Sequence, residues 1–150
     1  MIFDKTLLVS AAQVVTVTAN STDTIDLGAT GAPYGTLPSG SPVGAIARDI
    51  GPGRDIDVWC AITAAMTAGG TSLVVTLEVD DNTGFSSAVE VYRSPTYLAA
   101  QLVAGFRLLP DRIPIRTNER YLRAKYTCVG TFSGGGHITC GIVAAAQTNA

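Results

Sequence analysis

Charged side chains are scarce in this chain of 150 residues, because Asp, Glu, Lys and Arg together make up only 15% of it. Hydrophobic residues make up 47%, so either much of the chain forms a core or some apolar surface is covered by a partner. The net charge of −2 gives no general affinity for phosphate backbones, and we expect no nucleic-acid partner.

Long apolar runs are also missing. No stretch reaches the roughly 18 apolar residues needed to span a bilayer, and Met1–Ser10 lacks the basic start and apolar core of a signal peptide. We therefore expect no membrane partner and a protein that is made and kept in a cytoplasm. The three cysteines are an odd number, which does not suit a secreted disulfide scaffold, and we expect all of them to be reduced.

Arrangements typical of a catalytic or metal site are not evident in the sequence. His137 is the only histidine, and together with Cys128 and Cys140 it suggests a zinc site. On a continuous strand, however, positions three apart point to opposite faces, so His137 and Cys140 do not converge on one ion. The cysteines lie on apolar faces that disfavour thiolates, and Asp80–Gly84 and Gly134–Gly136 are typical of turns. We expect no enzyme activity, no metal and no cofactor.

The sequence does contain many runs in which apolar side chains recur at every second position, the period of a β-strand. In one such run Val58, Cys60 and Ile62 alternate with Trp59 and Ala61. The runs predicted as strands are 57–66, 73–80, 89–92, 121–128 and 138–144, with weaker signals at 14–18, 24–27 and 43–50.

Glycine-rich stretches join several of these runs. Ala68–Thr71 predicts a hairpin between the strands on either side of it, and Ser133–Gly136 predicts a second hairpin. The second hairpin would set Cys128 directly across from Cys140. Thr96–Leu109 is the only helix candidate, because its leucine and phenylalanine side chains recur at every fourth position, but an irregular or extended path fits it equally well.

Short strands, frequent turns and almost no helix predict an all-β protein. The expected architecture is a β-sandwich or jelly roll, formed by a single domain over residues 1–150. Residues 1–12 are expected to form an extended N-terminal arm. The stretch 28–42, rich in Gly, Pro, Ser and Thr, is expected to form a loop longer than the usual connection.

Positive charge gathers late in the chain. Residues 1–100 hold ten acidic and four basic side chains, whereas residues 101–150 hold two acidic and six basic ones. This cationic stretch can be a solvated edge with local pairs to Asp111 and Glu119. It can also be a docking face for an acidic surface, since arginine pairs with carboxylates through two hydrogen bonds. Its members are Arg107, Arg112, Arg116, Arg120, Arg123 and Lys125.

Both ends of the chain resemble a known family. The opening, Ile2–Gln13 followed by Ser21–Gly28, is similar to the start of the capsid cement proteins of Bordetella-phage type. Arg120–Tyr126, Gly134–Gly136 and Ile138–Ala144 resemble that family's closing hairpin. The resemblance implies a jelly-roll protein that sits as homodimers on the outside of an icosahedral head, where it binds the phage major capsid protein. It places the protein in the virion after assembly in the host cytoplasm.

The residues that would contact the capsid are expected in two groups. The N-terminal segment and the long loop can add to a neighbouring sheet edge or fill its grooves. Arginines form the second group, and Arg116→Glu with Arg120→Glu should weaken head binding without affecting folding. The candidate contact residues are Ile2, Phe3, Asp4, Lys5, Tyr34, Leu37, Arg112, Arg116, Arg120 and Arg123.

An alternative is a carbohydrate- or receptor-binding β-sandwich module of a phage tail or fibre, since this architecture hosts many such sites. Sugar-binding surfaces usually expose aromatic side chains. Tyr92 and Tyr97 are the only aromatic cluster in the sequence, and Trp59 is expected in the core or in an interface.

Overall fold

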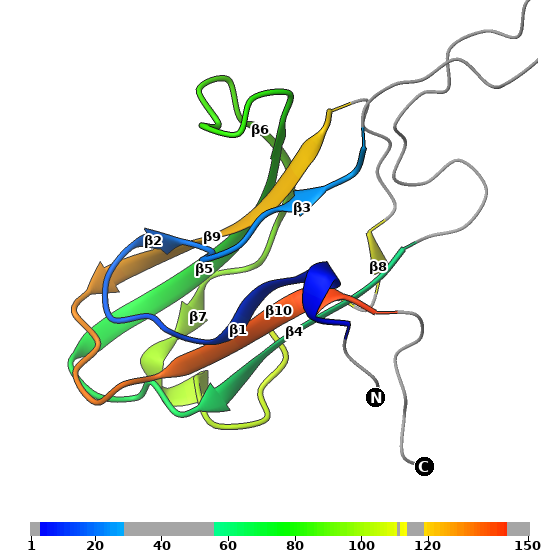
Figure 1. Cartoon of the computed structure of the whole chain (residues 1–150). Coiled ribbons are helices and arrows are strands. Elements are labelled where there is room, and N and C mark those ends of the chain that lie inside the picture. Colours follow the sequence, from blue (N-terminus) through cyan, green and yellow to red (C-terminus); the bar gives the residue numbers. More distant parts are fainter. Residues whose placement is uncertain (1–3, 29–55, 111, 114–118, 144–150) are drawn as a thin grey trace, which may run out of the picture.

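Two antiparallel sheets packed face to face make up the structure, a computed structural model that describes residues 4–28, 56–110, 112–113 and 119–143 (Figure 1). The longest helical elements within these residues are single 3₁₀ turns, η1 (Lys5–Leu7) and η2 (Ala99–Gln101). The prediction of an all-β sandwich is confirmed.

The smaller sheet has four strands in the order β1-β10-β4-β8. Their bounds are Leu8–Val14 for β1, His137–Ile142 for β10, Ile56–Ala64 for β4 and Arg112–Ile113 for β8.

The larger sheet is built around two long central strands in the order β2-β9-β5-β6, with β3 also paired to β9 and β7 to β5. Their bounds are Ala19–Asn20 for β2, Ile25–Asp26 for β3, Gly70–Asp80 for β5, Val89–Arg93 for β6, Tyr97–Leu98 for β7 and Tyr121–Gly130 for β9. The β5–β9 ladder runs from the Gly70–Gly130 pair to the Asp80–Tyr121 pair, so nearly the whole of both strands is hydrogen-bonded.

The core lies between the two sheets and is formed by the inward-facing side chains that the alternation predicts. A polar bridge crosses this core, because the hydroxyl groups of Ser10 on β1 and Tyr126 on β9 lie 2.7 Å apart. The Ser10 hydroxyl also donates to Gln13, so this buried pair is satisfied. The core side chains include Val9, Val58, Cys60, Ile62, Ile138 and Cys140 from the smaller sheet and Leu73, Val75, Leu77, Val79, Leu122, Ala124 and Tyr126 from the larger one.

Both predicted glycine-rich hairpins are wrong, although the strands on either side of them are correct. β4 and β5 belong to different sheets, as do β9 and β10, so each glycine-rich stretch carries the chain across the sandwich. As a result Cys140 pairs with Cys60 on β4, and Cys128 faces Leu73 on β5. A cross-over buries the apolar faces of two strands against each other, whereas a hairpin would have placed them side by side.

The cross-over after β9 is held by a buried aromatic ring. Phe132 is almost fully buried, and its backbone N–H donates to Thr16. Gly70 lies directly against this ring, and a Cβ atom at position 70 would collide with it. Glycine is therefore required at position 70 by close packing rather than by an unusual backbone angle.

The helix considered for Thr96–Leu109 does not form. The chain makes β7 and the single turn η2, and then follows β4 as an irregular extended segment. Its backbone groups bond to β4, with Leu108 N–H donating to Cys60 and Ile62 N–H donating to Phe106. The extended alternative is confirmed, because these hydrogen bonds complete the open edge of β4.

The extended arm predicted for residues 1–12 is wrong from Lys5 onward. Lys5–Leu7 form η1, and β1 pairs with β10 while burying Val9 and Ser10. The weak strand signal at 24–27 is confirmed by β3, but the signal at 14–18 overlaps β1 only at Val14, where that strand ends. The predicted strand 43–50 and all but the first residue of the predicted loop 28–42 lie outside the described residues.

The close contact between residue 70 and the Phe132 ring predicts coupled effects on stability. Phe132→Ala should lower the free energy of unfolding by about 3–5 kcal/mol because it empties a core position. Gly70→Ala should lower the free energy of unfolding of the wild type. The decrease should be smaller in the Phe132→Ala background, where the ring is gone. Chemical denaturation of the four proteins measures this coupling, and strictly additive effects would contradict the packing described here.

Candidate functional site

The outer face of the larger sheet carries a carboxylate held between two cations. Glu78 on β5 is nearly buried and lies opposite Arg123 on β9. The Arg123 guanidinium donates two hydrogen bonds to Glu78 Oε2, from Nε at 2.9 Å and from Nη2 at 2.7 Å. Lys125 Nζ lies 3.4 Å from Glu78 Oε1. Because two cations face one anion, this group carries a local excess of positive charge.

A structured turn between β5 and β6 supports this cluster. Phe85 is buried in the turn with a positive φ of 51°, and the Arg123 guanidinium lies 4.1 Å from the centre of its ring. The Asp80 carboxylate accepts hydrogen bonds from the backbone N–H groups of Asn82 at 2.9 Å and Ser87 at 2.7 Å. Burial alone would raise the pKa of Asp80, but these hydrogen bonds outweigh it and hold the pKa below its ordinary value. The turn therefore fixes the ring over which Arg123 lies.

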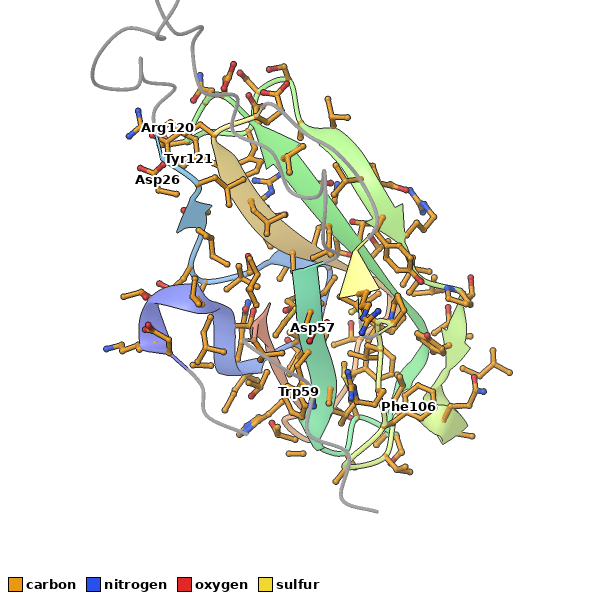
Figure 2. The ribbon with its side chains drawn as sticks, turned by 90° about the vertical axis from the view of Figure 1, so that its right-hand side faces the viewer. Asp26, Asp57, Trp59, Phe106, Arg120 and Tyr121 are labelled. Carbon is orange, nitrogen blue, oxygen red and sulfur yellow. The ribbon has the colours of Figure 1, made fainter. Side chains whose placement is uncertain are left out.

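A second ion pair lies at the start of β9. Arg120 binds both carboxylate oxygens of Asp26, from Nε at 2.9 Å and from Nη2 at 2.8 Å, and its guanidinium lies 5.1 Å from the ring centre of Tyr121. These hydrogen bonds raise the pKa of Arg120. Figure 2 shows the three side chains together, with Asp26 contributed by β3.

Two other predicted arginines, Arg112 and Arg107, lie on or beside the smaller sheet. Arg112 on β8 pairs with Asp57 on β4 at 3.3 Å, and its side chain is largely exposed. The Arg107 guanidinium lies 5.7 Å from the ring centre of Trp59. Figure 2 shows Asp57 and Trp59 on β4, well apart from the Arg120 group.

The structure thus corrects the picture of one continuous cationic stretch. The predicted arginines are divided between two sheets, and Arg112, Arg120 and Arg123 pair with Asp57, Asp26 and Glu78, which are distant in the sequence. The partners expected from the sequence were the neighbours Asp111, which lies outside the described residues, and Glu119.

The remaining candidate contact residues are placed only in part. Asp4 caps η1, because its carboxylate accepts from the Thr6 backbone N–H at 2.9 Å and from the Thr6 hydroxyl at 2.7 Å. These hydrogen bonds lower the pKa of Asp4. Lys5 is exposed. The candidates Ile2, Phe3, Tyr34, Leu37 and Arg116 lie outside the described residues.

The cysteines are packed as core residues. Burial raises the pKa of Cys60 well above its ordinary value, and a hydrogen bond with Cys140 adds to the shift. Burial also raises the pKa of Cys128 to about 11. At neutral pH these two thiols stay protonated and are poor nucleophiles. His137 begins β10, and within the described part of the chain no three His, Cys, Asp or Glu side chains gather as metal ligands.

Sequence reasoning missed the acidic partners Asp26, Asp57 and Glu78. Glu78 lies on the outward face of its strand, and nothing in the sequence pattern indicated that it would be nearly buried. The β5–β9 register would have revealed the pair, because it places Glu78 opposite Arg123. The glycine-rich turn pointed instead to a pairing of β9 with β10.

The fold and the surface together define a β-sandwich protein whose outward charges are paired across strands. Comparison with known families gives a match to the family named Bbp16 over residues 9–146. The chain belongs to this family of Bordetella phage proteins. No curated protein matches the chain. Among the described residues, no helix is long and apolar enough to cross a membrane.

The Glu78 cluster predicts a large difference between two carboxylate substitutions. Glu78→Gln leaves two cations facing a neutral amide at a nearly buried position, and should lower the free energy of unfolding toward the low end of roughly 3–5 kcal/mol. Glu90→Gln is the matched control. The Glu90–Arg93 pair is exposed, so its loss should cost less than about 1 kcal/mol. If urea denaturation gives equal decreases in the free energy of unfolding for the two variants, burial does not strengthen the ion pairs of Glu78 with Arg123 and Lys125.

Proposed function

We propose that this protein is a capsid cement protein, which binds the outer surface of a phage head and stabilises the lattice of the major capsid protein. The observation that carries the proposal is membership of a Bordetella phage protein family over nearly the whole chain. A β-sandwich whose strands and charges are paired internally suits a structural role, because it offers a rigid surface that loses little conformational freedom on binding. The proposal assigns no catalytic step, cofactor or metal to the chain.

Binding to an assembled lattice explains how a small protein could reinforce a shell. A ligand that binds only the assembled state stabilises it by RT ln(1 + [L]/Kd) for each site filled. A homodimer that touches two or more capsid subunits gains further from effective concentration, so modest interfaces give durable attachment. Homodimers also suit the twofold axes of an icosahedral shell.

The ion-paired arginines are the proposed docking groups within the described residues. Arg112 and Arg120 keep part of their side chains exposed while holding carboxylates of their own chain. Such pairs fix the guanidinium groups in place, and rim charges of this kind mainly set the rate and orientation of association. The candidates Ile2, Phe3, Tyr34, Leu37 and Arg116 stay predictions.

The carbohydrate- or receptor-binding alternative receives no specific support from the aromatic side chains. Tyr92 and Tyr97 are packed against the core. Tyr97 makes an edge-to-face contact with Phe106, and the two ring centres lie 5.0 Å apart. A sugar platform needs well-exposed ring faces, whereas these two rings are partly buried.

The copy number of this chain in virions tests the proposal first. We expect a ratio near one per major capsid protein in banded particles, measured by quantitative gel or mass spectrometry, because a cement protein covers the shell. A handful of copies per particle, or none, would reject the cement role and favour a tail component or a protein outside the virion.

A charge swap tests whether Arg120 faces the shell. Arg120→Glu should slow association with heads several-fold and reduce its salt dependence, because a rim cation is lost. It also breaks the pair with Asp26. The double variant Arg120→Glu with Asp26→Arg reverses that pair and keeps the net charge, so it should recover the lost stability.

The swap separates docking from local structure. If Arg120 contacts the shell, the double variant binds heads as slowly as the single one. Wild-type binding of the swapped protein to heads, measured by cosedimentation at low and moderate salt, would mean that Arg120 serves only its own chain.

A further inference from the structure

Charged residues are absent from five long stretches of this chain. Residues 6–22, 27–47, 58–77, 94–106 and 126–150 contain no Asp, Glu, Lys or Arg. Only the first two residues of 27–47 are described by the structure. Such a division is not expected of an ordinary soluble surface, where charges of both signs are interspersed.

The fold brings one segment of each of the stretches 6–22, 58–77, 94–106 and 126–150 together at one end of the sandwich. In the smaller sheet Val14, His137 and Ala64 are cross-strand neighbours at this end, and in the larger sheet Gly70 pairs with Gly130. Backbone hydrogen bonds tie the connecting segments to one another. They run from Val15 to Gly136, from Phe132 to Thr16, from Ser133 to Ala68 and from Met66 to Leu102. We call this region, formed by residues 14–18, 64–72, 98–105 and 129–137, the uncharged end; it lies at the lower left in Figure 1.

The uncharged end also exposes most of the large apolar side chains found at the surface. Among the described residues, six such side chains are about half exposed, between 48% and 58%. Five of them lie at this end, and the sixth, Val89, pairs with Val79 near the opposite end of β5. The five are Val14, Val17, Leu98, Val103 and Val129.

This composition matches the buried part of a protein interface. Interface cores are depleted of charged residues, and large exposed apolar groups that gather at one place mark an interaction surface. The rest of the described surface contrasts with it, because it carries the charged side chains, several of which pair within the chain, as in Arg123–Glu78 and Arg120–Asp26. The uncharged end is therefore the part of the described surface best suited to lose its water.

We propose that the uncharged end is the surface by which two copies of this chain associate. A partner surface that carried charges would have to lose their hydration here without finding any counter-charge, which is costly. A second copy presents the same uncharged surface, so two copies meet without like-charge repulsion and without an unpaired buried charge. A twofold contact requires a self-complementary patch of this kind.

This inference names the contact for the homodimer of the proposed function, but it is tested on the isolated protein. The test variant is Val129→Lys with Val103→Lys, which adds two cations to each copy at the uncharged end. In a twofold contact like charges then face each other, and the dimer dissociation constant should rise on the order of tenfold or more. The control is Val89→Lys, because Val89 is 51% exposed against 56% for Val129. Analytical ultracentrifugation of all three proteins over a concentration series gives the dissociation constants.

The expected result is a dimeric wild type, a weakened double variant and a control that associates like the wild type. A wild type that stays monomeric at every concentration overturns the inference, as does a double variant that still dimerises normally. Loss of head binding by the double variant, with a monomeric wild type, would assign the uncharged end to the shell instead. Circular dichroism melting verifies folding. If the double variant is unfolded, Val103→Lys alone, on a loop, makes the same test.

Neither outcome depends on the cement role. A dimer that forms through the uncharged end but is absent from virions would leave the inference standing and reject the proposed function. A chain abundant in virions whose isolated form never self-associates would do the reverse.

Discussion

The ladder between β5 and β9 is the interaction on which the rest of the molecule depends. Because it keeps one register from the Ser72–Val129 pair to the Asp80–Tyr121 pair, it decides which side chains of both strands point inward and which point outward. On the inner face it places Val75 opposite Tyr126 in the core. A shift of one residue would bury charges and expose the core, so the ladder constrains both the stability and the surface of the sandwich.

The strands themselves could be predicted from the sequence, but their partners could not. Alternation at period two found the runs that became β4, β5, β6, β9 and β10, because burial on one face of a sheet selects every second side chain. Alternation does not say which sheet a strand joins. Gly70 is consistent with a hairpin by its residue type, yet in the structure its missing side chain makes room for Phe132 in a cross-over. The deciding contact is tertiary, and it lies about sixty residues away along the chain.

The same limit explains what was missed on the surface. The arginines late in the chain were recognised from composition, whereas their acidic partners were not, because Asp26, Asp57 and Glu78 lie far from them in sequence and become neighbours only through strand register. The helix candidate at Thr96–Leu109 failed for a related reason. Its leucines have helical spacing, but Leu102 and Leu108 are buried along an extended segment whose backbone completes the edge of β4.

The distribution of charge follows from this architecture and has consequences for assembly. Charges paired across strands, such as Arg123–Glu78, hold neighbouring strands in register and leave the folded chain little to rearrange when it meets a partner. An end without charges contributes nothing to long-range steering, so contacts there are formed only after close approach and depend on shape and apolar burial. A protein organised in this way can separate the two steps of association, with the ion-paired strands guiding its orientation and the uncharged end providing short-range contact.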